Sequence, residues 1–184
     1  MSEEPPSPGM AISVVVQDQA WRELLPRPEF VAERASRAAL DSQAAENAPL
    51  VPPQGAELCI VLASDDLVRK LNRTYCHLDR ATNVLSFADL DSPAEAAPGA
   101  PRIMGDVVLA RETIQKEARE QHKSMADHLS HLVVHGVLHL LGYDHQDDRD
   151  AERMEHLERT ILNRLGVADP YRSGAAAECR EVLD

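Results

Sequence analysis

The sequence predicts an α+β fold, a small four-stranded mixed sheet covered by about five helices, with an apolar metal-site helix at the centre. Three observations support this class. Four short runs are rich in β-branched and aliphatic residues. Five longer segments have helical spacing, and the order along the chain is β-α-β-α-β-β-α-α-α. The 184 residues are enough for one domain with a real core.

The first half of the chain supplies two strands and two helices. AISVVVQD at 11–18 and ELCIVLA at 57–63 are short and apolar, which is typical of strands. A helix is expected over 28–43, and its initial proline suits the first helical turn. A second helix is expected over about 65–74, where Ser64 can serve as the N-cap.

The third and fourth strands are expected at 82–87 and 102–110, in TNVLSF and RIMGDVVLA. Gly105 lies inside the fourth strand and indicates a bulge or a close approach of another backbone. Asp106 follows it, and is either a buried structural carboxylate or a residue that lines a cleft.

Three helices follow. RETIQKEAREQH at 111–122 predicts a helix with a polar face. The segment 125–141 is apolar nearly all round, so we expect it to be the buried central helix. Ser124 and Asp127 form an S-x-x-D capping pattern in front of it. The last helix is expected over 148–165, with acids at its start and one core-facing apolar stripe.

The remaining segments have no periodic pattern. Residues 1–9 are acidic and proline-rich, unlike a secretory signal, and predict a disordered leader. Loops are expected at 47–55 and 89–101, and a tail without a readable pattern at 173–184. The predicted domain therefore spans 10–172.

Composition narrows the possible functions. The formal net charge of −12 is unlike that of a general nucleic-acid binder, so any RNA contact must come from a local positive patch. Three cysteines without a CxxC pair are typical of reduced, cytosolic thiols. No apolar run approaches the about 20 residues of a membrane span. We therefore expect a cytoplasmic protein without a membrane partner.

The stretch HGVLHLLGYDH at 135–145 carries the most specific chemistry. His135 and His139 are four residues apart, which puts both imidazoles on one helix face. Gly142 is typical of a helix C-cap, and the turn after it can bring His145 back toward the first two. Three neutral imidazoles and one open position are typical of catalytic zinc, so one Zn²⁺ per chain is expected.

Two more histidines share that helix face. His131 forms a rival i, i+4 pair with His135. His128 lies roughly 16 Å from His139 along the axis, at about 1.5 Å per residue, so one ion cannot use both. The glycine stop favours the pair nearest to it, because only that pair has a third histidine within reach.

A zinc ion with an open position lowers the pKa of its water towards ~7, so hydrolysis is the expected reaction class. Metalloproteases usually carry HExxH, in which the glutamate is the general base. Gly136 occupies that place here, which weakens the protease reading. Asp144 is the nearest acid and a candidate catalytic base. It is equally a candidate for orienting His145 or His139.

The histidine stretch resembles the signature of the YbeY family of bacterial metal-dependent endoribonucleases. LNRTY at 71–75, TNVLSF at 82–87, GDVVLA at 105–110 and LGVADPY at 165–171 are similar to family segments, in the family order. The resemblance covers roughly residues 10–172 and implies a single metallohydrolase domain with the fold predicted above.

The resemblance also implies a substrate and partners. These are single-stranded RNA, above all ribosomal RNA, and the small ribosomal subunit, with roles in maturing the 3′ end of 16S RNA and in ribosome quality control. No DNA partner is expected. An alternative reading is a ribosome-assembly factor whose zinc is mainly structural.

A basic segment precedes the third strand. It holds four basic residues and one acid, which are Arg69, Lys70, Arg73, Arg80 and Asp79. Such a run is often only a solvated helix face. The contrast with the acidic chain, together with the resemblance, favours a phosphate-contacting patch. Arg73 and Arg80 are therefore candidate substrate contacts, and Ser86 of TNVLSF joins them.

One departure from the family pattern follows the LNRTY tyrosine. The family usually has an arginine and then a glycine-containing turn, whereas this chain has Cys76 and His77. Cys76 is either a neutral replacement, with the charge supplied by Arg73 or Arg80, or a fourth zinc ligand that closes the site.

Overall fold

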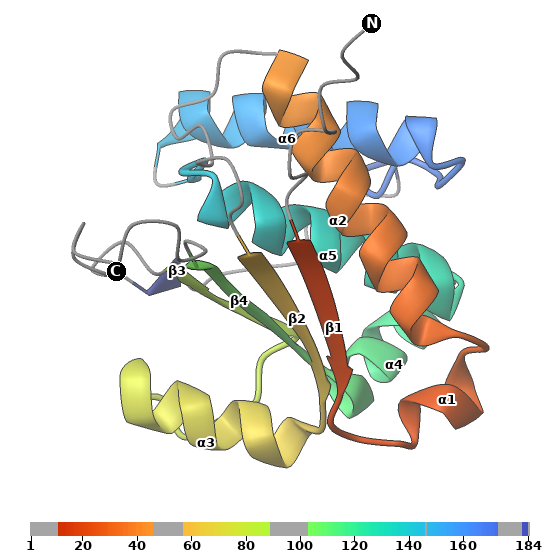
Figure 1. Ribbon diagram of the computed structural model, residues 1–184, viewed down its shortest axis with the longest axis vertical. Helices are drawn as coiled ribbons and strands as arrows, with labels where there is room; N and C mark the ends of the chain where they lie inside the picture. Colours follow the sequence, from red (N-terminus) through yellow and green to blue (C-terminus); the bar gives the residue numbers. More distant parts are fainter. Residues whose placement is uncertain (1–10, 46–56, 89–102, 146, 173–181, 184) are drawn as a thin grey trace, which may run out of the picture.

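The computed structural model describes residues 11–45, 57–88, 103–145, 147–172 and 182–183. They form one mixed sheet with helices on both faces (Figure 1). The strands are β1 (Ala11–Val16), β2 (Glu57–Ala63), β3 (Val84–Ala88), β4 (Ile103–Ala110) and β5 (Val182–Leu183), in the spatial order β1-β2-β4-β3-β5. β1, β2 and β4 are parallel, whereas β3 is antiparallel to β4 and parallel to β5.

β1 to β4 confirm the predicted four-stranded mixed sheet, and the two residues of β5 extend it beyond β3. The predicted irregularity at Gly105 is also confirmed. The β2–β4 register shifts there, and Gly105 has φ +145°. A Cβ at this position would lie 2.2 Å from the Phe87 carbonyl oxygen. Only glycine therefore allows β3 and β4 to approach so closely.

The five predicted helices are present with small shifts at their ends. They are α2 (Pro28–Ala45), α3 (Asp65–Tyr75), α4 (Arg111–Glu120), α5 (Met125–Leu140) and α6 (Asp148–Arg164). A further helix, α1 (Trp21–Leu24), is too short to leave a periodic signal in the sequence. It is held because Trp21 is fully buried and its Nε1 donates to the Ala63 carbonyl at 2.9 Å.

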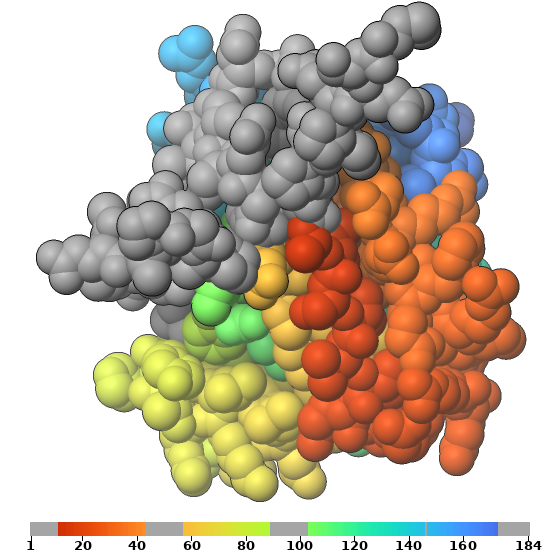
Figure 2. Space-filling model, viewed as in Figure 1, coloured from red at the N-terminus to blue at the C-terminus, as the bar shows by residue number. Residues whose placement is uncertain are grey.

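The helices divide between the two faces of the sheet. α2, α5 and α6 lie on one side and α3 on the other (Figure 1). Every residue of α5 from His128 to Leu140 is buried, which confirms the predicted central helix. β1 is an edge strand with alternate residues exposed, and Figure 2 shows it at the surface beside α2.

The start of α3 differs in detail from the expected cap. Ser64 occupies the N-cap position, but its hydroxyl makes no capping hydrogen bond. Instead, Glu112 Oε2 accepts from the Asp65 N–H at 2.8 Å, and the Asp65 carboxylate accepts from the Thr113 N–H at 3.0 Å. The first turns of α3 and α4 therefore cap each other.

Several predicted segments fall outside the described residues. These are the leader 1–9, the loops 47–55 and 89–101, and the tail 173–184 apart from β5. Of the helices that the structure describes, none combines the length and apolarity that crossing a membrane requires.

Candidate metal centre

The ends of α5 are set by local sequence. Ser124 Oγ accepts from the Asp127 N–H at 3.0 Å, as the capping pattern predicts. At the other end Gly142 has φ +86°, and its N–H donates to the His139 carbonyl at 2.9 Å. The Tyr143 N–H donates to the Leu138 carbonyl at 3.1 Å, and the two hydrogen bonds together form a Schellman motif. This glycine therefore stops the helix and turns the chain back along it.

The turn after Gly142 places His145 beside the two histidines of α5. The ring centroids of His135 and His139 are 4.5 Å apart, and those of His139 and His145 are 4.9 Å apart. One ring nitrogen from each of the three residues lies within 4.8 Å of the other two. The predicted trio is thus brought together as a possible metal site. No second group of this kind occurs within the described ranges.

Two contacts decide which nitrogens face the centre. His135 Nδ1 lies 2.6 Å from Glu158 Oε1, and His139 Nδ1 lies 2.9 Å from the Tyr143 carbonyl oxygen. An ionised carboxylate and a carbonyl can only accept, so each Nδ1 carries the proton and donates. In neutral rings the two Nε2 atoms then have lone pairs, and they lie 3.0 Å apart. Two such acceptors repel each other unless a proton or a metal ion lies between them.

The third histidine strengthens the fit to a metal ion. His145 Nε2 is buried without a hydrogen-bond partner in the described structure, which is costly for a polar atom. Burial, helped by the neighbouring His135 and His145, lowers the pKa of His139 to about 3. His139 is therefore neutral at physiological pH, and neutral imidazole is the form that binds metals. The donor set fits a divalent ion.

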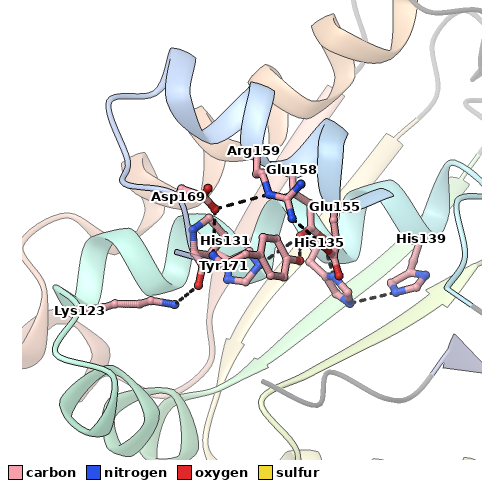
Figure 3. Close-up of polar contacts among 10 residues, drawn as sticks. Lys123, His131, His135, His139, Glu155, Glu158, Arg159, Asp169 and Tyr171 are labelled. Atoms are coloured by element: carbon pink, nitrogen blue, oxygen red, sulfur yellow. Dashed lines mark hydrogen bonds and ion pairs between the residues drawn. The ribbon is translucent and has the colours of Figure 1, made fainter. Parts of the chain in front are cut away.

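The other two histidines of α5 do not join this group. His131 Nε2 lies 3.3 Å from Glu158 Oε2, and His128 Nε2 lies 2.8 Å from Glu117 Oε2. The rival pair of His131 and His135 therefore does not converge on one point, because its members contact different oxygens of Glu158 (Figure 3).

Glu158 is a site residue that sequence reasoning missed. It is fully buried on α6, beside Leu157 and Ile161 of the predicted core-facing stripe. Burial acts to raise the pKa of Glu158, but the facing imidazoles of His135 and His131 outweigh it and hold the pKa well below its ordinary value. One sequence signal could have identified it: an acidic residue lies next to the core-facing stripe of this helix, and a buried carboxylate requires hydrogen-bonding or charged partners.

Gly136 faces the sheet and allows α5 to approach it closely. A Cβ at this position would lie 2.6 Å from Val107 Cγ1 and 3.0 Å from Ser86 Oγ. Ser86 is buried there, and its hydroxyl donates to the Gly136 carbonyl at 3.2 Å. A glutamate does not fit at this position, where HExxH proteins carry their base. The predicted substrate contact of Ser86 remains a prediction.

Asp144 is half-buried in the turn that presents His145. Its Oδ1 accepts from the His145 backbone N–H at 2.7 Å. This bond shapes the turn and so helps to place the third imidazole. Whether the carboxylate also acts as a base or as a partner of a ring nitrogen stays a prediction.

The predicted basic patch is exposed on α3 and on the turn after it. Arg73 and Arg80 are both exposed. Arg69 donates to both carboxylate oxygens of Asp79, at 2.8 and 3.0 Å, and this lowers the pKa of Asp79. Asn72 Nδ2 donates to the Arg80 carbonyl at 3.0 Å and holds the turn against the helix. Arg73 and Arg80 are therefore exposed on a segment whose conformation is fixed by these hydrogen bonds.

The departure at Cys76 and His77 lies at the end of α3. Cys76 is half-buried against the apolar cluster beneath α3 and is not a member of the histidine group. His77 has φ +59°, the left-handed conformation that favours glycine. The backbone therefore explains why a glycine suits this position, and why a histidine here is strained.

A hollow of about 580 Å³ opens between α3 and the sheet. Its walls include Leu71, Tyr75 and Phe87, and the last two rings meet edge to face at 5.3 Å. Asp106 is exposed and also lines the hollow, so it is a cleft residue on the α3 face and not a buried structural acid.

Fold and site together define an α+β protein whose central helix and following turn carry a three-histidine candidate metal centre. The family model described as "Endoribonuclease YbeY" matches residues 26–166. The chain belongs to the YbeY endoribonuclease family.

Individual relatives agree with this assignment. The endoribonuclease YbeY of Paramagnetospirillum magneticum is 51% identical over 87% of this chain and 94% of its own length. That of Parvibaculum lavamentivorans is 57% identical over 70% and 74%. A solution structure from Thermotoga maritima covers 88% of this chain and 99% of its own, at 19% identity and a TM-score of 0.49. Family membership therefore rests on the sequence matches, and it confirms the resemblance.

Proposed function

We propose that the protein is a zinc-dependent endoribonuclease that cuts single-stranded RNA. The observation that carries this proposal is the convergence of three imidazoles, two of which are held with Nε2 inward by Glu158 and Tyr143. Three histidine nitrogens are a ligand set of catalytic zinc sites. The family supports the reaction, since the relatives are named endoribonucleases.

A zinc ion held by His135, His139 and His145 would supply a nucleophilic water at neutral pH and would polarise a phosphoryl oxygen. The side chains around it have separate tasks. The Asp144 carboxylate, next to His145, is the candidate group for taking a proton from the attacking water. Arg73 and Arg80 offer positive charge to the RNA backbone in a protein of net charge −12.

The packing of Gly136 argues against a peptidase of the HExxH type. The HExxH mechanism needs a carboxylate after the first histidine, and a side chain at Gly136 would collide with Val107. A peptidase would therefore need a different base at this centre.

The proposal extends to cellular roles through the family likeness. We infer that the substrate is ribosomal RNA, including the 3′ end of 16S RNA, and that the protein acts with the small ribosomal subunit in maturation and quality control. A cytoplasmic location is part of the proposal, and the thiol of Cys59, which forms no disulfide, supports it.

Cleavage by the purified, zinc-loaded protein tests the proposal. The substrates are an unstructured RNA, the same RNA annealed to its complement, and casein. We expect cleavage of the single strand, slower cleavage of the duplex and none of casein, and we expect His139→Ala to lose the activity. Casein cleavage without RNA cleavage, lost in the same variant, would overturn the proposal.

A complementation experiment separates the enzyme from an assembly factor with a structural zinc. Cells that carry only His135→Ala should accumulate unprocessed ribosomal RNA if cleavage is the function. Normal ribosome maturation by a variant that is inactive on RNA in vitro would favour the assembly factor.

A further inference from the structure

Glu158 is the one fully buried carboxylate among the described residues, and it contacts the candidate metal centre from a different helix. It comes from α6, whereas His131 and His135 come from α5 (Figure 3). Oε1 lies 2.6 Å from His135 Nδ1, and Oε2 lies 3.3 Å from His131 Nε2. The Tyr171 hydroxyl also donates to Oε2. Each carboxylate oxygen therefore has its own partner set.

The two oxygens have different consequences for the site. An acceptor at Oε1 requires a proton on His135 Nδ1, and a neutral imidazole with that proton has its lone pair on Nε2. Nε2 is the nitrogen that faces His139. The contact at Oε1 thus sets both the tautomer and the ring direction of His135. The contacts at Oε2 act on Glu158 alone.

We propose that Glu158 is a positioning residue for the metal centre, which fixes His135 with Nε2 toward the ion, and that Tyr171 and His131 hold Glu158 in place. The inference rests on the proposed function only in that the three histidines bind a metal. Hydrogen-bonded carboxylates of this kind orient metal-binding histidines and strengthen their binding.

The segment after α6 supplies the rest of the support. Asp169 Oδ1 accepts from the Tyr171 N–H at 2.9 Å, and the Arg159 guanidinium lies 5.0 Å from the centre of the Tyr171 ring. Lys123 Nζ donates to the Pro170 carbonyl at 3.3 Å. These contacts surround the backbone and ring of Tyr171 (Figure 3), so its hydroxyl reaches Glu158 from an anchored position.

The first experiment needs no substitution at Glu158. Long-range ¹H–¹⁵N correlation spectra of the metal-free protein, labelled at histidine and recorded at mildly alkaline pH, report which ring nitrogen carries the proton. A His135→Asn variant assigns the signal. We expect the Nδ1–H tautomer for His135 in the wild-type protein. The Nε2–H tautomer would overturn the proposal.

The second experiment compares variants that remove or weaken the hydrogen-bond acceptor at position 158. Their Zn²⁺ affinity is measured by competition with a chromophoric chelator. Glu158→Leu keeps the volume but removes the acceptor. We expect it to lose the single His135 tautomer and to bind Zn²⁺ about 10–100-fold more weakly. Glu158→Gln keeps an acceptor oxygen, so it should keep the tautomer and lose less affinity. Tyr171→Phe should have the smallest effect of the three.

Glu117→Leu is the matched control. Glu117 Oε2 lies 2.8 Å from Nε2 of His128, a histidine on the same helix α5 as His135, but His128 does not belong to the three-histidine group. The Zn²⁺ affinity of the Glu117→Leu variant should stay within twofold of wild type. Equal losses in the Glu117 and Glu158 variants, or none in Glu158→Leu, would show that the carboxylate acts only through general stability. If Glu158→Leu does not fold, the tautomer of His135 in the wild-type protein still tests the proposal, because the Nε2–H form would overturn it.

These readouts do not depend on RNA cleavage. A protein that binds Zn²⁺ through His135 with the expected tautomer, yet leaves RNA intact, would contradict the proposed function and support this inference. A protein that cuts RNA while His135 carries its proton on Nε2 would support the proposed function and contradict this inference.

Discussion

Gly136 of α5 fits closely against Val107 of the sheet, because a Cβ on the glycine would lie 2.6 Å from Val107 Cγ1. The separation between α5 and β4 is therefore set by a missing side chain. His135 is the preceding residue of the same helix, so a change in this separation would also move a candidate metal ligand.

The Gly136→Ala variant should lower the free energy of unfolding by about 1–3 kcal/mol, the usual cost of overpacking a core. Urea denaturation measures it. Val107→Ala removes the colliding methyl groups, so the double variant should lose less stability than the sum of the two single variants. Strict additivity would show that the collision is relieved by other movements.

Each histidine of the trio should be required for zinc binding. Single His→Ala variants at 135, 139 and 145 should each bind less than one zinc per chain, as measured by metal analysis after gel filtration. His131→Ala should retain the metal at saturating zinc, because its Nε2 contacts Glu158 and not the centre, so only part of the support of Glu158 is lost. Cys76→Ala is the control and should retain the metal in full, because the thiol is outside the histidine group. Metal loss in Cys76→Ala, or in His131→Ala but not in His145→Ala, would contradict the assigned ligand set.

Arg73 should contribute to RNA affinity through charge alone. Arg73→Ala should weaken binding to unstructured RNA and reduce the slope of log affinity against log salt by about 0.7, the single-strand value for one phosphate contact. Fluorescence anisotropy at several salt concentrations measures both. Arg37→Ala on α2 removes an exposed arginine elsewhere and should leave the slope unchanged. Equal effects in the two variants would mean that only net charge matters.

The strain at His77 predicts a stabilising substitution. Its φ of +59° is unfavourable for a residue with a Cβ, so His77→Gly should raise the free energy of unfolding by up to about 1 kcal/mol. The neighbouring Thr74→Gly places the same residue inside α3, where glycine is unfavourable, and should lower it. A loss of stability in His77→Gly would indicate that the imidazole makes contacts that outweigh the strain.

The Asp18–Arg111 pair predicts an acid-dependent contribution to stability. Arg111 Nε donates to Asp18 at 2.6 Å and lowers the pKa of that carboxyl below its usual 3.8. The folded state therefore favours ionised Asp18. The contribution is complete above the unfolded pKa and disappears as pH falls through the lower, folded one. Asp18→Asn should destabilise the protein near neutral pH, and the difference from wild type should shrink below about pH 4. A difference that is constant with pH would exclude this linkage.

The local features of the fold could be predicted because they depend on neighbouring residues. The caps at Ser124 and Gly142 are determined by short-range hydrogen bonds, and the apolar composition of 125–141 leaves it no position except the interior. The histidine trio could be predicted for the same reason. α1 could not, because its one turn is held by the distant contact of Trp21 with Ala63.

Long-range relationships needed the structure. The sequence does not reveal that β4 lies between β2 and β3, since each strand has a similar apolar pattern. The assignment of Glu158 to the site also needed the structure. Its contacts with α5 depend on how α6 packs against that helix, and the residue spacing within α6 does not encode this packing.

All three histidines of the centre fall within residues 135–145. Closing so short a loop costs little entropy, so the denatured chain keeps these imidazoles near one another. It should therefore retain measurable affinity for zinc, and any affinity of the denatured chain reduces the stabilisation that a bound zinc ion would give to the native one. What the native fold adds is direction, through the turn at Gly142 and the contact of Glu158, because proximity is already present in the covalent chain.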